Sequence, residues 1–308
     1  MLVRTILSGV ALLSSAGAVL AGDAAPSPAR WTVAFSADAI YATRGDVAND
    51  PLIQDAVTGD TVVSGKNFGF DWAPGADLGL TITDQTVDFT GRFIGGLSFD
   101  STVKAETPAI WTIPTAPPLF GLGVAETTNT YSSDFNSVEF NAGRDVGPVN
   151  AFVGVRAVWF NDALGTSADF GGNRADVNWS VDTTGVGPQI GAIWSGNAGP
   201  VRVNLDGRVG YLWTTSDADF SVTQDIGPPF GASSGVSGGT AIAEAGISAG
   251  VPLTSTLQLK AGYRVIWMNS MPTAIGSIAN TDVLAGSIDP ATDDILIHGG
   301  TVGLTAHF

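Results

Sequence analysis

The sequence lacks cysteine and is poor in charged residues. Without cysteine, the chain has no disulfide, no thiolate zinc site and no cysteine nucleophile. Asp, Glu, Lys and Arg make up 14% of the 308 residues, whereas a typical soluble domain has about 25%. Basic residues are especially few, with 13 Lys and Arg against 29 Asp and Glu. This balance argues against a nucleic-acid partner, because the chain would repel phosphate groups.

Long apolar runs are also lacking beyond the first 21 residues. At the start, Arg4 precedes the apolar stretch 6–20, and Val19 and Ala21 supply the small residues of a cleavage site. This pattern predicts a Sec signal peptide over residues 1–21, a periplasmic linker over 22–30 and one folded domain over 31–308. No later stretch has 18 consecutive apolar residues, so no transmembrane helix is expected.

From residue 31 onward, apolar and polar residues alternate. In the stretch 201–213, VRVNLDGRVGYLW, most odd-numbered residues are apolar and most even-numbered residues are polar or small. Such a period of two predicts β-strands rather than helices. The strands are long enough to cross a bilayer, which takes about 9–11 tilted residues. Ten strands are expected, over residues 31–42, 68–82, 87–99, 131–144, 149–159, 183–194, 201–213, 241–251, 257–267 and 295–308, with twelve strands as the alternative.

The connections between these strands alternate in length. Short turns are expected near 83–86, 145–148, 196–200 and 251–255, and long loops over 45–65, 101–130, 162–178, 214–237 and 270–294. Short periplasmic turns and long extracellular loops are typical of outer-membrane barrels. The fold class is therefore predicted to be all-β, a transmembrane antiparallel up-and-down β-barrel with both ends of the domain in the periplasm. Loops 101–130 and 214–237 are candidates to fold inward as a plug.

The apolar face of the strands is expected to point outward, toward lipid. Trp159, Trp213 and Trp267 end three strands on that face, as in the aromatic girdle at a water–lipid boundary. The alternative is that they are core residues of a soluble barrel. The chain ends in Phe308 on the same face, and a terminal Phe that closes an alternating strand resembles the signal used by the bacterial barrel-assembly machinery. These features predict insertion into the outer membrane of a Gram-negative bacterium.

Two stretches carry a more specific resemblance. Residues 131–144, YSSDFNSVEFNAGR, lead through a turn to a strand that ends near Trp159, and the chain ends with HGGTVGLTAHF over 298–308. Both stretches resemble the Legionella-type major outer membrane protein family of pore-forming barrels. The resemblance consists of loose strand patterns, so it implies pore formation but supplies no catalytic residues.

Charged residues on the polar face are expected to line the lumen. Their signs alternate between neighbouring strands, which predicts two cross-strand ion clusters, one around Glu139 and one around Glu244, because buried charges need partners. Most of the net charge of −16 falls in the long loops, so the outer mouth should be acidic and attract cations. The predicted lumen residues are Asp38, Arg92, Glu139, Arg156, Arg202, Asp206, Arg208, Glu244, Lys260 and Arg264.

A ten-stranded barrel is close in size to barrels that are filled by their own side chains. The sequence therefore predicts a narrow, cation-preferring pore for ions or small solutes. The alternative is a closed structural or adhesive barrel without a conducting pore. The expected partners are outer-membrane lipid and lipopolysaccharide, and the barrel-assembly machinery. The transported solute and the oligomeric state stay open.

An enzyme is not expected. The chain has two histidines, of which His307 lies at the periplasmic end and His298 shares the lipid-facing parity of Val302 and Leu304. Neither has the oriented partner that a general base needs. Asp289, Asp293 and Asp294 do not follow the spacing of a calcium loop. No catalytic residue, cofactor or metal ligand set is therefore predicted.

Overall fold

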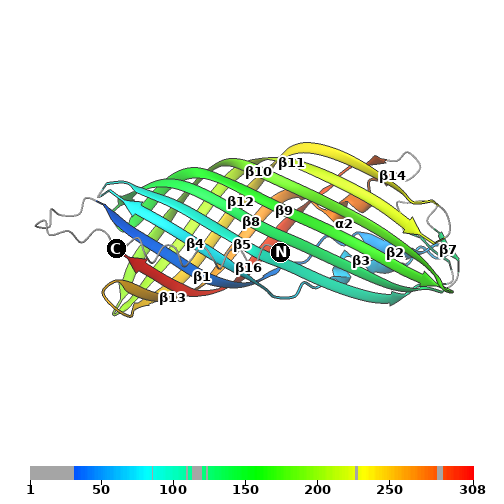
Figure 1. Cartoon of the computed structure of the whole chain (residues 1–308), viewed down its shortest axis with the longest axis horizontal. Helices are drawn as coiled ribbons and strands as arrows, with labels where there is room; N and C mark the ends of the chain where they lie inside the picture. Colours follow the sequence, from blue (N-terminus) through cyan, green and yellow to red (C-terminus); the bar gives the residue numbers. More distant parts are fainter. Residues whose placement is uncertain are drawn as a thin grey trace, which may run out of the picture.

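The computed structural model describes residues 31–84, 86–108, 110–112, 120–122, 124–225, 228–282 and 287–308, so the predicted signal peptide and linker lie outside the described residues. Ten antiparallel strands form a closed barrel (Figure 1), which confirms the predicted fold class and strand number. In neighbouring order they are β1 (Thr32–Arg44), β16 (Thr292–His307), β13 (Leu257–Pro272), β12 (Phe230–Pro252), β11 (Val201–Gln224), β10 (Asn173–Ala198), β9 (Val149–Phe170), β8 (Glu126–Val146), β5 (Asp88–Glu106) and β4 (Ala73–Thr83), which pairs with β1.

One end of the barrel, which we call the short-turn end, carries the four predicted short connections. They span residues 84–87, 147–148, 199–200 and 253–256. Gly147 and Gly199 have φ angles of 65° there, a left-handed conformation that glycine adopts without strain. The two ends of the domain meet at the same place, since the amide of Phe308 donates to the carbonyl of Val33 at 2.8 Å.

At the opposite end, which we call the extended end, two predicted loops are wrong. Residues 162–178 belong almost entirely to β9 and β10, which are joined by Gly171 and Gly172 with φ angles of 63° and 88°. Most of residues 214–237 belongs to β11 and β12. The strands β8 to β12 therefore reach well beyond β1, β4, β13 and β16, and the barrel is longer on one side (Figure 1).

The polarity of the wall inverts along these long strands. In β9, Val153, Val155 and Trp159 are 61%, 53% and 42% exposed on the outer face. The next residue on the same face is Asn161, and from Val158 onward the apolar residues point inward, with Val158, Phe160 and Leu164 at most 1% exposed. The same inversion occurs in β10 and β11. Each long strand thus has an apolar exterior near the short-turn end and an apolar interior near the extended end.

The apolar interior is filled by two segments that we call the plug, the described parts of residues 46–70 and 273–291. The first holds β2 (Pro51–Asp55), β3 (Thr61–Ser64) and η3 (Gly65–Asn67), and the second holds α2 (Ala274–Ile278), β14 (Thr281–Asp282) and β15 (Ser287–Ile288). A small sheet runs in the order β3-β2-β6-β7, with β6 (Ile110–Thr112) and β7 (Phe120–Leu122) from the predicted loop 101–130. The expectation that 214–237 forms a plug is wrong, because its described residues continue the wall.

The plug and the wall share one hydrophobic core. In the plug, Leu52, Ile53, Ile275 and Ile278 are at most 1% exposed. On the wall, Tyr131, Phe135, Phe160, Trp179 and Phe220 point inward and are at most 2% exposed. Phe68 of the plug meets Tyr131 edge to face with ring centroids 5.5 Å apart. Burial of these apolar side chains stabilises the plug by the hydrophobic effect, which contributes about 25 cal/mol for each Å² of apolar surface removed from water. Among the described residues, no helix is long and apolar enough to cross a membrane.

Candidate functional site

A network of charged side chains crosses the bore between the plug and the short-turn end. Its centre is Glu244 of β12, which the alternating pattern directs into the lumen. One carboxylate oxygen accepts from Arg92 Nη1 at 2.7 Å and from Arg264 Nη1, and the other accepts from Arg156 Nη1 at 2.8 Å. Glu244 is 3% exposed, so its charge is balanced by guanidinium groups rather than by water.

Glu139 of β8 is the second centre of the network. It accepts from Arg208 Nη1 at 2.8 Å, from Arg92 Nη1 at 3.2 Å and from the side-chain amide of Gln189 at 2.9 Å. Arg156 Nη1 lies 3.5 Å from the same carboxylate. Because Arg92 and Arg156 contact both glutamates, the two predicted ion clusters are one network.

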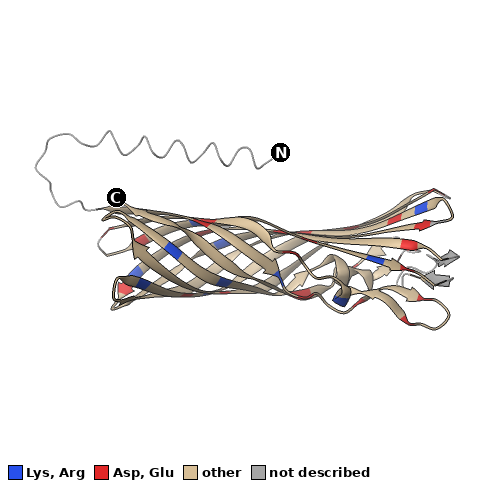
Figure 2. Ribbon diagram, turned by 90° about the horizontal axis from the view of Figure 1, so that it is seen from below, with Lys and Arg blue, Asp and Glu red and all other residues tan. Residues whose placement is uncertain are grey.

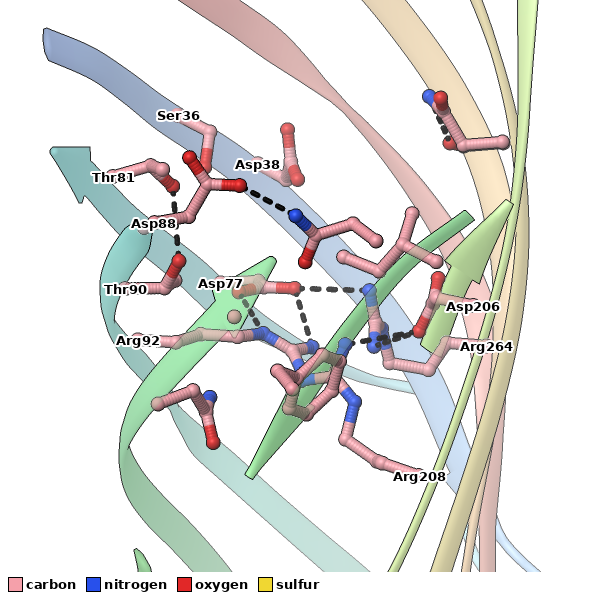
Figure 3. Close-up of a pocket in the computed structure, with 18 of the residues that line it drawn as sticks. Ser36, Asp38, Asp77, Thr81, Asp88, Thr90, Arg92, Asp206, Arg208 and Arg264 are labelled. Atoms are coloured by element: carbon pink, nitrogen blue, oxygen red, sulfur yellow. Dashed lines mark hydrogen bonds and ion pairs between the residues drawn. The ribbon is translucent and has the colours of Figure 1, made fainter. Parts of the chain in front are cut away.

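Two aspartates complete the network at its edge toward the short-turn end (Figure 3). Asp77 accepts two parallel hydrogen bonds from Arg92, both 2.8 Å long, and lies 3.3 Å from Arg264 Nη2. Asp206 accepts from Arg208 Nη2 at 3.1 Å. The sequence prediction missed Asp77, although its position between outward-facing residues of β4 was a sufficient signal. We call these residues the ion network: Asp77, Arg92, Glu139, Arg156, Asp206, Arg208, Glu244 and Arg264.

The ion network holds four carboxylates against four guanidinium groups. Its members are almost entirely buried, apart from Asp206 and Arg264 with side-chain exposures of 13% and 16%. Such a network braces the strands and fills the space between them, since every charge has a partner at close range. Three predicted lumen residues, Asp38, Arg202 and Lys260, lie outside it. Lys260 pairs instead with Asp38 at 2.7 Å, and Arg202 is exposed near the short-turn end.

A second buried ion pair joins two wall strands, β1 and β9, across the bore and also holds the plug. Asp162 of β9 accepts from Arg44 Nη1 at 2.6 Å, from Tyr131 Oη at 2.6 Å and from the backbone amide of Ala274 at 2.9 Å. Arg44 also lies over the rings of Phe70 and Tyr131. Ala274 is the first residue of α2, so the Asp162 carboxylate binds the start of this helix directly. Nothing in the sequence pattern pointed to this pair.

The plug has further polar contacts with the wall. Trp179 Nε1 donates to Thr281 Oγ1 at 3.2 Å, and Asp293 accepts from the backbone amide of Ala48 at 3.1 Å. Within the plug, burial raises the pKa of the Asp50 carboxyl, and the negative charge of Asp293 raises it further. The plug is therefore held by side chains of several strands.

Between the ion network and the short-turn end the bore is polar and hollow, and we call this space the vestibule. Cavities of about 600 Å³ and 430 Å³ lie at its mouth, and one of about 210 Å³ lies against the ion network. Thr81 lines all three, so they adjoin one another. Figure 3 shows Ser36, Asp38 and Asp88 around the inner cavity. The vestibule is thus open at the short-turn end and ends at the ion network.

The predicted girdle residues lie on the outer wall, with Trp159, Trp213 and Trp267 exposed by 42%, 64% and 36%. Phe308 is 78% exposed at the short-turn end. Toward the extended end, acidic residues outnumber basic ones (Figure 2), and Asp182 lies directly opposite Asp217 on neighbouring strands. In the part of the chain that the structure describes, no group of three His, Asp or Glu is arranged to hold a metal ion.

No protein family model matches the sequence, and no curated protein matches it. Among solved structures, the outer membrane protease OmpT from Escherichia coli is similar, with a TM-score of 0.50, 11% identity, and coverage of 93% of this chain and 99% of OmpT. The translocator domain of the autotransporter NalP from Neisseria meningitidis has a TM-score of 0.39 at 13% identity, covering 99% of this chain and 96% of that domain. The anion-selective porin from Comamonas acidovorans has a TM-score of 0.18 at 11% identity, covering 90% of this chain and all of that one. The similarity to OmpT shows a shared outer-membrane β-barrel fold.

Proposed function

We propose that this chain is an outer-membrane β-barrel that is closed across its bore and presents a rigid surface outside the cell. The apolar exterior near the short-turn end supports the membrane location, since outward apolar residues on a closed barrel suit lipid. By the same rule the short-turn end faces the periplasm and the extended end faces the outside. The acidic outer surface of β8 to β12 would then be the part that meets other molecules.

One observation carries the closed state, namely that two successive layers fill the bore. The plug packs into an apolar core, in which Leu52 and Ile275 are fully buried. Below it, the ion network joins strands on opposite sides of the barrel, such as β5 and β12 through Arg92 and Glu244. An ion would have to displace paired charges and then pass an apolar layer, and both steps are costly.

The mature chain refolded into a planar lipid bilayer is expected to pass no discrete current steps in KCl. A variant in which residues 273–291 are replaced by a short Gly-Ser linker serves as the comparison, because it removes α2 and its apolar contacts. Heat-modifiable gel migration confirms that each protein is folded. Regular current steps from the unmodified chain would contradict the closed state and support the pore.

The second candidate is the narrow cation-preferring pore that the sequence and its family resemblance predict. Two features favour it, namely the hollow vestibule and the acidic extended end. In this case the plug would have to leave the bore, and cation preference would arise from the acidic surface. A reversal potential directed toward the cation under a KCl gradient would support this candidate.

We also propose that the chain is not an enzyme. His307 lies at the short-turn end, and His298 lies on the outer wall beside Tyr263 rather than beside a carboxylate. The proposed partners are outer-membrane lipid around the apolar wall, and the barrel-assembly machinery, through β16 and its terminal Phe308.

A further inference from the structure

Four side chains form an aromatic group on the outer wall, and we call it the Tyr–His patch: Tyr41, Trp72, Tyr263 and His298. Tyr41 and Trp72 stack with ring centroids 5.4 Å apart, and Trp72 meets the His298 ring edge to face at 6.1 Å. The Tyr263 hydroxyl lies 2.6 Å from His298 Nδ1. The residues come from β1, β13, β16 and the position just before β4, which are neighbours in the barrel.

The patch lies near the outer boundary of the apolar wall. His298 is the next outward position below Leu296, which is paired with Trp267. Above that level the outward residues are polar, and Asn269 donates to Asp294 at 2.9 Å. In the proposed orientation this is the level where the hydrocarbon of the outer leaflet meets its headgroups.

A histidine at this position is unusual for a lipid-facing strand. Its outward neighbours on β16 are Leu296, Val302 and Leu304, with Gly300 between them. Ionisable residues in the membrane are costly and mark functional sites. In the hydrogen bond between the Tyr263 hydroxyl and His298 Nδ1 either group can be the donor, and in the tautomer in which the hydroxyl donates, the ring proton lies on Nε2. This hydrogen bond uses only Nδ1, and His298 is half-buried on the outer wall, so Nε2 can serve as the donor to a molecule outside the chain.

The patch also contains a hollow over Gly300. Gly300 is paired with Tyr41 on one side and with Tyr263 on the other. A Cβ atom at Gly300 would find its nearest neighbour 3.9 Å away, at the carbonyl oxygen of Gly262. The space between the two tyrosines is therefore open. Their exposures of 58% and 43% leave ring faces free beside it.

We propose that the Tyr–His patch binds the sugar-phosphate headgroup of an outer-leaflet glycolipid. Exposed aromatic faces stack on sugar rings, and the Nε2–H of His298 donates to a phosphate or hydroxyl oxygen. Tyr263 is a positioning residue, because its hydroxyl hydrogen-bonds Nδ1 and orients the ring, so that the tautomer with its proton on Nε2 can donate to the lipid. This inference rests on the proposed outer-membrane location, but it does not depend on whether the bore conducts.

Native mass spectrometry of the full mature barrel in detergent micelles tests the site. The probes are a phosphorylated lipid A with a short core sugar and, separately, phosphatidylglycerol. His298→Ala and Gly300→Val are each expected to weaken lipid A binding about tenfold, as loss of a hydrogen bond to a charged group does. Tyr263→Phe is expected to give a smaller loss, which separates positioning from direct contact.

Trp213→Ala is the matched control, because Trp213 and Tyr211 form a similar exposed aromatic pair without a histidine. Lipid A binding that is unchanged in this variant and lost in His298→Ala supports the site. If both variants lose lipid A binding equally, the patch contributes only the general lipid contact of an aromatic girdle, and the proposal is overturned. Equal binding of phosphatidylglycerol would also overturn it. Heat-modifiable gel migration shows that each variant is folded. The outcome of the conductance experiment does not affect the interpretation of lipid binding, so failure of one proposal is distinguishable from failure of the other.

Discussion

Replacing Glu244 by glutamine is expected to lower the free energy of unfolding by about 3–5 kcal/mol, the usual effect of breaking a buried ion pair from one side. The Glu244 carboxylate contacts Arg92, Arg156 and Arg264, and Arg208 Nε lies 3.8 Å away. The amide that replaces it carries no charge, so the guanidinium groups would lose their common counter-charge in a closed space. Urea unfolding of the refolded barrel in micelles, followed by tryptophan fluorescence, measures the change.

Asp217→Asn is the matched control for this change. It also converts a carboxylate to an amide, but Asp217 lies on the exposed outer face of β11, and it is expected to change stability by at most about 0.5 kcal/mol. A second variant, Glu244→Gln with Arg264→Gln, removes one positive charge as well and should recover part of the loss. If Glu244→Gln unfolds at the same urea concentration as Asp217→Asn, the ion network does not brace the barrel.

The half of the barrel near the short-turn end was predictable from sequence. There the outward face is apolar and the inward face is polar or small, so a period of two locates both the strand and its orientation. The same parity directed Glu139 and Glu244 into the lumen. Turn positions followed because short turns carry recognisable glycines, such as Gly147 and Gly199.

The extended half was not predictable in the same way, for a physical reason. In β10, Val177, Trp179 and Val181 are buried and point inward, so the period of two continues there, but its apolar phase has shifted to the other face. If apolar residues are expected to face lipid, each strand is predicted to end where the apolar residues move to the other face. Residues 162–178 and 214–237 therefore looked like polar loops, although they form a wall that covers an apolar interior.

The order of the strands predicts which residues lie on neighbouring strands, but it does not predict which side chains meet across the bore. The prediction paired charges on adjacent strands, such as Glu139 and Arg156. It could not foresee that Arg92 reaches Glu244, because β5 and β12 are not adjacent. The Arg44–Asp162 pair was missed for the same reason, because β1 and β9 are not adjacent either.

Replacing Asp162 by alanine is expected to release the plug while the barrel stays folded. The change leaves Arg44, 4% exposed, without its counter-charge. It also removes the acceptor for Tyr131 Oη and for the amide of Ala274. A cost of about 3–5 kcal/mol for an unpaired buried charge corresponds to an increase of at least about 100-fold in the open population of the plug. Limited proteolysis of the segment 273–291, analysed by mass spectrometry, measures this population.

Asp182→Ala is the control, because Asp182 is an exposed aspartate on the neighbouring strand β10, and its proteolysis rate should match that of the unmodified chain. If Asp162→Ala is cleaved no faster than this control, Asp162 does not anchor the plug. Conductance of the same variant then separates the two layers that close the bore. Current steps would mean that the plug is the barrier and that the ion network, which is intact in Asp162→Ala, lets ions through. A silent bilayer together with faster cleavage would mean that the ion network closes the barrel without the plug, since its paired charges join strands on opposite sides of the bore, such as β5 and β12.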